Sequence, residues 1–138
     1  MNLNDLIIRI HNDWEDTDVL PVIERVLRSL SIHKEYLQDT PINLRELCEY
    51  SGLSNTENEL VYKATNYLIH PSIHVLNLRY ELYDNGLFEI TADEIYEAQK
   101  DGALYHPVTG REIPNFENEV TLSFVLSHEF INAEGAIS

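Results

Sequence analysis

Cysteine is scarce in this sequence, which contains only Cys48. A single thiol cannot form a disulfide within the chain, and this favours a reducing compartment such as the cytoplasm. No apolar run approaches the roughly 20 residues that a membrane-spanning helix needs. The first residues, 1–5, lack the basic flank and the cleavage site of a signal peptide. The sequence therefore predicts a soluble cytoplasmic protein with no membrane contact.

Basic residues are also scarce, and they end early in the chain. The 138 residues include 24 acidic and 9 basic side chains, for a formal net charge of −15. Up to Tyr80 the net charge is −5, whereas from Glu81 onward 12 acids face only Lys100 and Arg111, for −10. Such a charge repels nucleic acids and attracts basic surfaces. Solubility is one explanation of the acidity, but it does not account for the difference between the two halves.

Motifs for catalysis and metal binding are missing too. We find no glycine-rich phosphate loop, nucleophile elbow or paired-cysteine ligand motif. His70 and His74 have the spacing of helical metal ligands, but a proline lies between them. Asp13 and Glu24 are spaced as the outer ligands of an EF-hand loop, yet the position that must be glycine is an aspartate. We therefore expect no enzymatic activity, metal or cofactor, and expect Cys48 to be buried.

The apolar residues, 43% of the chain, are sufficient for one folded core. Apolar side chains at helical spacing and three capping boxes, in which a Thr or Asn is followed three residues later by Glu, mark helices. The boxes begin at Asn43, Thr56 and Thr91, and glycines at 52 and 102 follow the helices at their C-terminal ends. The predicted helices cover residues 3–10, 19–30, 43–52, 56–69 and 91–102.

Alternating apolar residues predict a hairpin over residues 73–90. A three-residue loop would place Leu82 opposite Phe88 and keep both on the buried face, with Gly86 in the left-handed conformation. It would also set Glu81 opposite Glu89 on the outer face, an unfavourable pair whose presence hints at a functional surface. The remaining predicted strands form a second hairpin over residues 103–113 and a last strand over 120–126.

The order helix, turn, helix, hairpin over residues 43–90 resembles a winged-helix domain of the helix-turn-helix superfamily. The motif residues are Leu44-Arg45-Glu46-Leu47-Cys48, Ser51-Gly52-Leu53-Ser54 and Glu59-Leu60-Val61-Tyr62-Lys63-Ala64. The resemblance implies an α+β fold, with a winged-helix-like domain over residues 1–102. A β-hairpin and C-terminal strand over residues 103–138 would pack on this domain as one compact body.

The acidic residues of this region depart from the DNA-binding pattern of the family. A recognition helix presents its N-terminal residues to the major groove. Here those residues include Glu57 and Glu59, and Lys63 is the only base on the helix. The resemblance therefore favours a winged helix that contacts proteins, although a helix-turn-helix transcription regulator remains the alternative.

These observations favour a non-enzymatic component, an accessory subunit or an inhibitor, that binds the basic surface of another protein. Acids on a rigid surface can also imitate nucleic acid, as expected of inhibitors in phage–host conflict such as anti-CRISPR, anti-restriction and toxin-immunity proteins. Aromatic rings among the acids would anchor the partner, although a lone tryptophan is more often part of a core. The candidate partner-binding residues are Asp13, Trp14, Glu15, Asp16, Asp18, Glu81, Asp84, Glu89, Asp93, Glu94, Tyr96, Glu97 and Tyr105.

Overall fold

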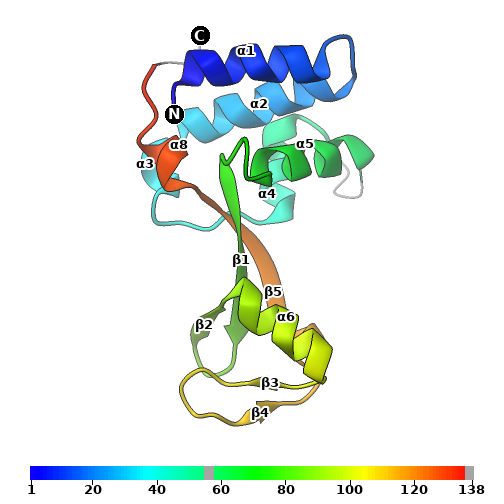
Figure 1. The fold of residues 1–138 in the computed structure, drawn as a ribbon, viewed down its shortest axis with the longest axis vertical. Helices are drawn as coiled ribbons and strands as arrows, with labels where there is room; N and C mark the ends of the chain where they lie inside the picture. Colours follow the sequence, from blue (N-terminus) through cyan, green and yellow to red (C-terminus); the bar gives the residue numbers. More distant parts are fainter. Residues whose placement is uncertain (55–57, 136–138) are drawn as a thin grey trace. The chain divides into compact units, whose positions relative to one another are not determined.

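The computed structural model describes residues 1–54 and 58–135, and these form an α+β fold, as the sequence predicts (Figure 1). In chain order the elements are α1 (Leu3–Trp14), α2 (Val19–Ile32), α3 (Lys34–Leu37), α4 (Leu44–Ser51), α5 (Glu59–Ile69), β1 (Leu76–Tyr83), β2 (Leu87–Ile90), α6 (Ala92–Asp101), β3 (Leu104–Tyr105), β4 (Glu112–Ile113), α7 (Phe116–Glu119), β5 (Val120–Leu126) and α8 (His128–Ile131). None of the helices in these described ranges has the length and apolarity that a bilayer crossing requires.

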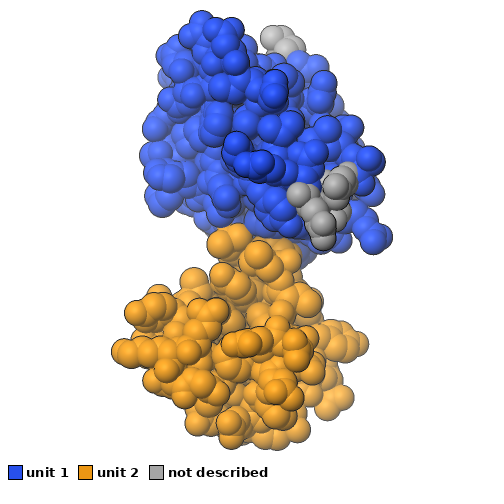
Figure 2. All heavy atoms as spheres, turned by 90° about the vertical axis from the view of Figure 1, so that its right-hand side faces the viewer, with its two compact units in different colours: residues 1–77, 124–138 blue, residues 78–123 orange. Residues whose placement is uncertain are grey.

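The chain forms two compact units (Figure 2). Unit 1 comprises residues 1–77 and 124–138, and unit 2 comprises residues 78–123. Strand β1 carries the chain from unit 1 into unit 2, and strand β5 carries it back. The sequence analysis expected a boundary at residue 102. In the structure the chain passes between the two units within strands β1 and β5.

Helix α2 is the central element of unit 1, since α1, α3, α4 and α5 all pack against it. Its predicted apolar stripe is buried in full and comprises Val19, Val22, Ile23, Val26, Leu27 and Leu30. Helix α4 is closed at both ends as expected. The Asn43 side chain accepts a hydrogen bond from the Glu46 N–H at 2.8 Å, Glu46 bonds back to the Asn43 N–H, and Gly52 has a φ of 78°. The buried position of Cys48 is also confirmed.

The start of α5 differs from the prediction. Thr56, the expected first cap, lies outside the described residues. The described helix begins at Glu59, and the Asn58 side chain caps it by accepting a hydrogen bond from the Leu60 N–H at 2.8 Å. The elements α4, α5, β1 and β2 follow one another in the order expected of a winged helix, while the relationship to that family stays a prediction.

The hairpin of unit 2 has the register that the sequence predicts. Leu82 lies opposite Phe88, and Glu81 lies opposite Glu89. Asn85 and Gly86 in the loop have positive φ values of 53° and 142°, and these conformations suit asparagine and glycine. The burial of apolar side chains on one face therefore determined the register, as inferred from the sequence.

The environment of Glu81 corrects the expectation of an acidic outer face. Glu81 is only 6% exposed, and its Oε1 accepts a hydrogen bond from the Ser123 hydroxyl at 2.7 Å. The Arg79 Nε lies 3.7 Å from the same oxygen. The sheet order β2-β1-β5 makes β1 the central strand. A hairpin alone would have left this carboxylate in water, but a neighbouring strand on the other side of β1 covers it.

We expect the substitution Leu82→Ala to lower the free energy of unfolding by about 2–5 kcal/mol, because it removes a fully buried side chain. Leu87→Ala is the matched control, since Leu87 lies on the same hairpin but is 57% exposed. Its effect should stay within about 0.5 kcal/mol. Chemical denaturation of the two variants measures both values. Equal losses for the two leucines would contradict the register.

Candidate protein-binding surface

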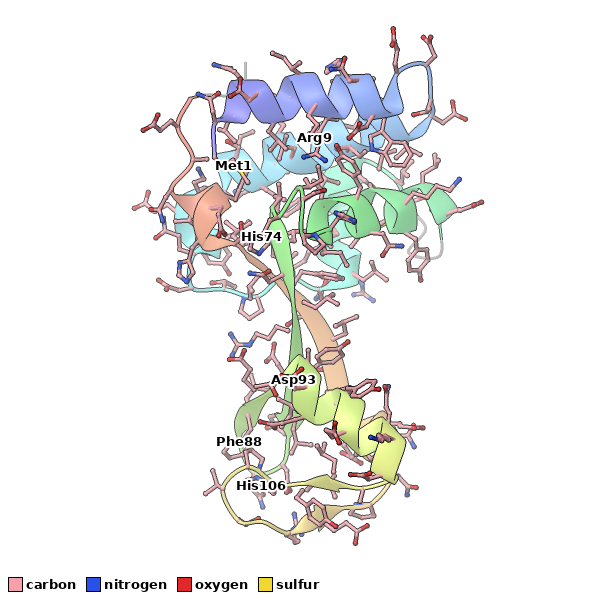
Figure 3. The ribbon with its side chains drawn as sticks, viewed as in Figure 1. Met1, Arg9, His74, Phe88, Asp93 and His106 are labelled. Atoms are coloured by element: carbon pink, nitrogen blue, oxygen red, sulfur yellow. The ribbon has the colours of Figure 1, made fainter. Side chains whose placement is uncertain are left out.

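Helix α6 buries one face and exposes the other. The Thr91 hydroxyl oxygen caps the helix by accepting a hydrogen bond from the Glu94 N–H at 3.1 Å. Gly102 ends it with a φ of 79°. Ile95 and Ala98 are buried in the core of unit 2, a cluster that also contains Leu82, Ile90, Leu104, Ile113 and Phe116. The polar face of α6 therefore points into solvent, and its first residues are seen around Asp93 in Figure 3.

Four carboxylates occupy this exposed face: Asp93, Glu94, Glu97 and Asp101. Asp93, Glu97 and Asp101 follow one another at four-residue spacing, so each is the neighbour of the next on the helix surface. Like charges at this spacing destabilise a helix by about 0.2–0.5 kcal/mol per pair. No ion pair joins any of the four to a base within residues 1–54 and 58–135. Unpaired negative charge is therefore concentrated on this face of the helix.

A groove of about 490 Å³ runs beside these acids, and all four contribute to its wall. The segment after α6 also lines the groove, through Ala103, Leu104, Tyr105 and Pro107. Tyr105 is 58% exposed, so its ring is available for contact. A lysine or arginine side chain would suit such a groove, because its apolar stem can lie against the tyrosine while its charged end meets the carboxylates.

The structure thus brings together four of the candidate residues: Asp93, Glu94, Glu97 and Tyr105. Tyr96 is exposed on the same helix but does not line the groove. Sequence reasoning missed Asp101 and Pro107. The position of Asp101, four residues after Glu97, could have revealed it as a member of the acidic face.

The three acids predicted on the first hairpin have different environments. Glu89 is exposed on β2, whereas the buried Glu81 cannot meet a partner. Asp84 is occupied by an ion pair with Arg111, and its Oδ2 lies 3.9 Å from the Nε2 of the buried His106. The His106 ring also packs edge-to-face on Phe88, with ring centroids 4.5 Å apart (Figure 3). Asp84 therefore stabilises the hairpin through these contacts, and its charge is not free to bind a partner.

The acidic turn of the candidate set lies in unit 1, between α1 and α2. Glu15, Asp16 and Asp18 are exposed there, and Asp16 has a φ of 59°. Trp14 is half-buried against the core of unit 1 and meets Tyr67 edge-to-face at 5.4 Å. Its indole N–H is buried without a hydrogen-bond partner in the described part of the chain. Trp14 therefore packs against the core, which was the alternative to an exposed role as a partner's anchor. The described residues of the turn present exposed acids but no exposed aromatic side chain.

Asp13 is bound within unit 1. It accepts a hydrogen bond from the Tyr67 hydroxyl, 2.7 Å from its Oδ2, and the Arg9 Nε lies 3.7 Å from the same oxygen. Burial of Tyr67 and the hydrogen bond and charge of Asp13 raise the pKa of the phenol, while Arg9 opposes them. The neutral form of Tyr67 is therefore the form that the fold favours.

The pH dependence of stability should show this raised pKa. Because the pKa of Tyr67 is higher in the folded than in the unfolded protein, the neutral phenol stabilises the fold below its unfolded pKa of 10.0. This stabilisation is lost as the pH rises above 10.0 toward the folded-state pKa. We expect the wild type to lose more stability than Tyr67→Phe between about pH 9 and about pH 11. Urea unfolding at both pH values measures the difference. Parallel losses in the two proteins would show that the pKa of Tyr67 is not raised.

Comparison with known proteins adds no relative to these observations. No protein-family model matches the chain, and no curated protein or solved structure is significantly similar to it. The function must therefore be inferred from the chemistry of the surface itself.

Proposed function

We propose that this protein acts in the cytoplasm as a non-enzymatic binding component that attaches to a basic surface of another protein. The attachment site is the acidic groove, which we define as Asp93, Glu94, Glu97, Asp101 and Tyr105. The single observation that carries the proposal is the convergence of four carboxylates, without a base paired to them in the described residues, on one groove beside an exposed tyrosine.

The charge balance of unit 2 supports this proposal. Residues 78–123 contain 10 acidic and 3 basic side chains. Two of the bases are already engaged, since Arg111 pairs with Asp84 and Arg79 lies beside Glu81. The resulting negative field would accelerate the approach of a basic partner and would weaken as salt screens it.

The spacing of the acids supports the more specific idea of a nucleic-acid mimic. Four helical residues advance about 6 Å along the axis, so Asp93, Glu97 and Asp101 form a regular row. Such a row of carboxylates on a helix would present successive negative charges to a basic channel. The corresponding role is an inhibitor of a nucleic-acid enzyme, as in anti-CRISPR, anti-restriction or toxin-immunity proteins.

Fewer observations support the alternative proposal, a helix-turn-helix regulator. Lys63, the base on α5, lies 3.3 Å from the carboxylate of Glu59. Arg79, on the hairpin, lies beside the buried Glu81. Each of the two elements that would meet DNA offers a single Lys or Arg in the described residues, whereas binding to DNA depends on several phosphate contacts.

We expect capture from a host lysate to yield a basic partner with the wild type and to fail when the acidic groove is neutralised. The variant combines Asp93→Asn, Glu94→Gln, Glu97→Gln and Asp101→Asn. A matched control in unit 1 combines Asp5→Asn, Glu35→Gln, Asp39→Asn and Glu49→Gln, which removes the same charge from exposed positions. The control should retain the partner. Equal capture by both variants would contradict the proposal.

The purified complex then tests the mimic. Its Kd should weaken at least tenfold between about 50 and about 300 mM salt, and an oligonucleotide should compete with this protein for the partner. Binding that is indifferent to salt would exclude an electrostatic interface. Salt-sensitive binding without competition would leave a basic partner and exclude mimicry.

A further inference from the structure

A second pocket, of about 400 Å³, lies in unit 1, and two bases and one acid are among its lining residues. Helices α1 and α5 both pack against α2, and the pocket is lined by the C-terminal half of α1, by α5 and by the turn that follows α5. We name it the cationic pocket because Arg9 and Lys63 line it beside the imidazole of His70, and Asp13 is the acid among its lining residues. In a chain of net charge −15 with only 9 Lys and Arg residues, such a gathering is unexpected.

Arg9 is held in position rather than free in solvent. Its Nη1 donates to the Ser72 carbonyl oxygen at 3.0 Å, and its Nη2 lies 3.2 Å from the Ser72 hydroxyl oxygen. Figure 3 shows the side chain leaving α1 on the side of α5. Asp13 offsets part of its charge, but that carboxylate also accepts the hydrogen bond of Tyr67. A guanidinium has five N–H donors, so others remain for a ligand.

Lys63 and His70 provide further donors. The partner of Lys63 is Glu59, whose side chain is 80% exposed, and an ion pair in such a position contributes little. The Nδ1 of His70 accepts a hydrogen bond from the Ser72 N–H at 3.1 Å, which places the ring proton of the neutral form on Nε2. Within the described residues Nε2 has no hydrogen-bond partner, so its N–H is available.

Apolar and aromatic groups complete the cationic pocket. Trp14 and Tyr67 line it as an edge-to-face pair, and Ile73 adds an aliphatic side chain. Asn66 contributes an amide. Cationic donors beside aromatic rings match a ligand that has one charged end and one flat apolar end.

We propose that the cationic pocket binds a small organic anion, with a carboxylate or phosphate group attached to a ring-sized apolar body. The anionic group meets Lys63, Arg9 and the Nε2–H of His70, and the apolar body lies against Trp14 and Tyr67. This site belongs to unit 1 and is independent of the acidic groove, so it adds a ligand to the proposed protein-binding function.

Trp14 provides the readout, because it is the only tryptophan of the chain and lines the pocket. We expect phenyl phosphate or benzoate to change its fluorescence in a saturable way, with a Kd near or below about 1 mM. Phenol lacks the charge and inorganic phosphate lacks the ring, so each should bind at least tenfold more weakly. No saturable change with either aromatic anion, or equal binding of inorganic phosphate, would overturn the proposal.

One variant and a matched control test whether Lys63 holds the anion. Lys63→Gln removes a half-exposed side chain and should weaken binding of the better anion at least about tenfold without altering the thermal stability. Arg45→Gln is the matched control, since it removes one positive charge from an exposed position of α4 outside the pocket. Equal affinities for the two variants would contradict the assignment. A duplex oligonucleotide that binds more tightly than phenyl phosphate, and only with Lys63 present, would replace the small anion by nucleic acid.

Discussion

The buried face of α6 is what holds the acidic face of the same helix in place. Repulsion between neighbouring carboxylates costs a few tenths of a kcal/mol per pair, whereas burial of one large aliphatic side chain contributes about 1.5–3 kcal/mol. The insertion of Ile95 and Ala98 into the core of unit 2 therefore outweighs the repulsion. The caps at Thr91 and Gly102 fix the two ends. The acidic groove depends on this balance, since its carboxylates would separate if the helix frayed.

Each unit carries one of the two proposed binding sites, and the charged side chains of the two sites have different local support. In unit 2 the four carboxylates of α6 have no base paired to them in the described residues, and they line the groove together with Tyr105. In unit 1 the network of Arg9, Asp13, Tyr67 and Ser72 orients cations around an aromatic wall. Fixed side chains lose less conformational entropy on binding than mobile ones. The proposed anion site in unit 1 is therefore one that the overall acidity would have led us to exclude.

Local patterns allowed much of the fold to be predicted. The apolar stripe of α2, the capping box at Asn43 and the hairpin register all depend on residues close together in sequence, so their physics is visible in the sequence itself. Three helices of four residues, α3, α7 and α8, were not predicted. They are too short to show a periodic apolar face, and surrounding structure stabilises them. The acidic face of α6 was predicted in part, because its four-residue spacing is also local.

The sequence by itself determined the net charge, the α+β class and which strand residues face a core, because these follow from composition and from periods of two and 3.6 residues. Only the tertiary structure decided which charges are free. Glu81 became buried because β5 covers the central strand, and Asp84 became paired because the second hairpin brings Arg111 to it. Trp14 and Lys63 came to line one pocket in the same way, through the packing of helices on α2. These outcomes depend on contacts between distant segments, which no local pattern encodes.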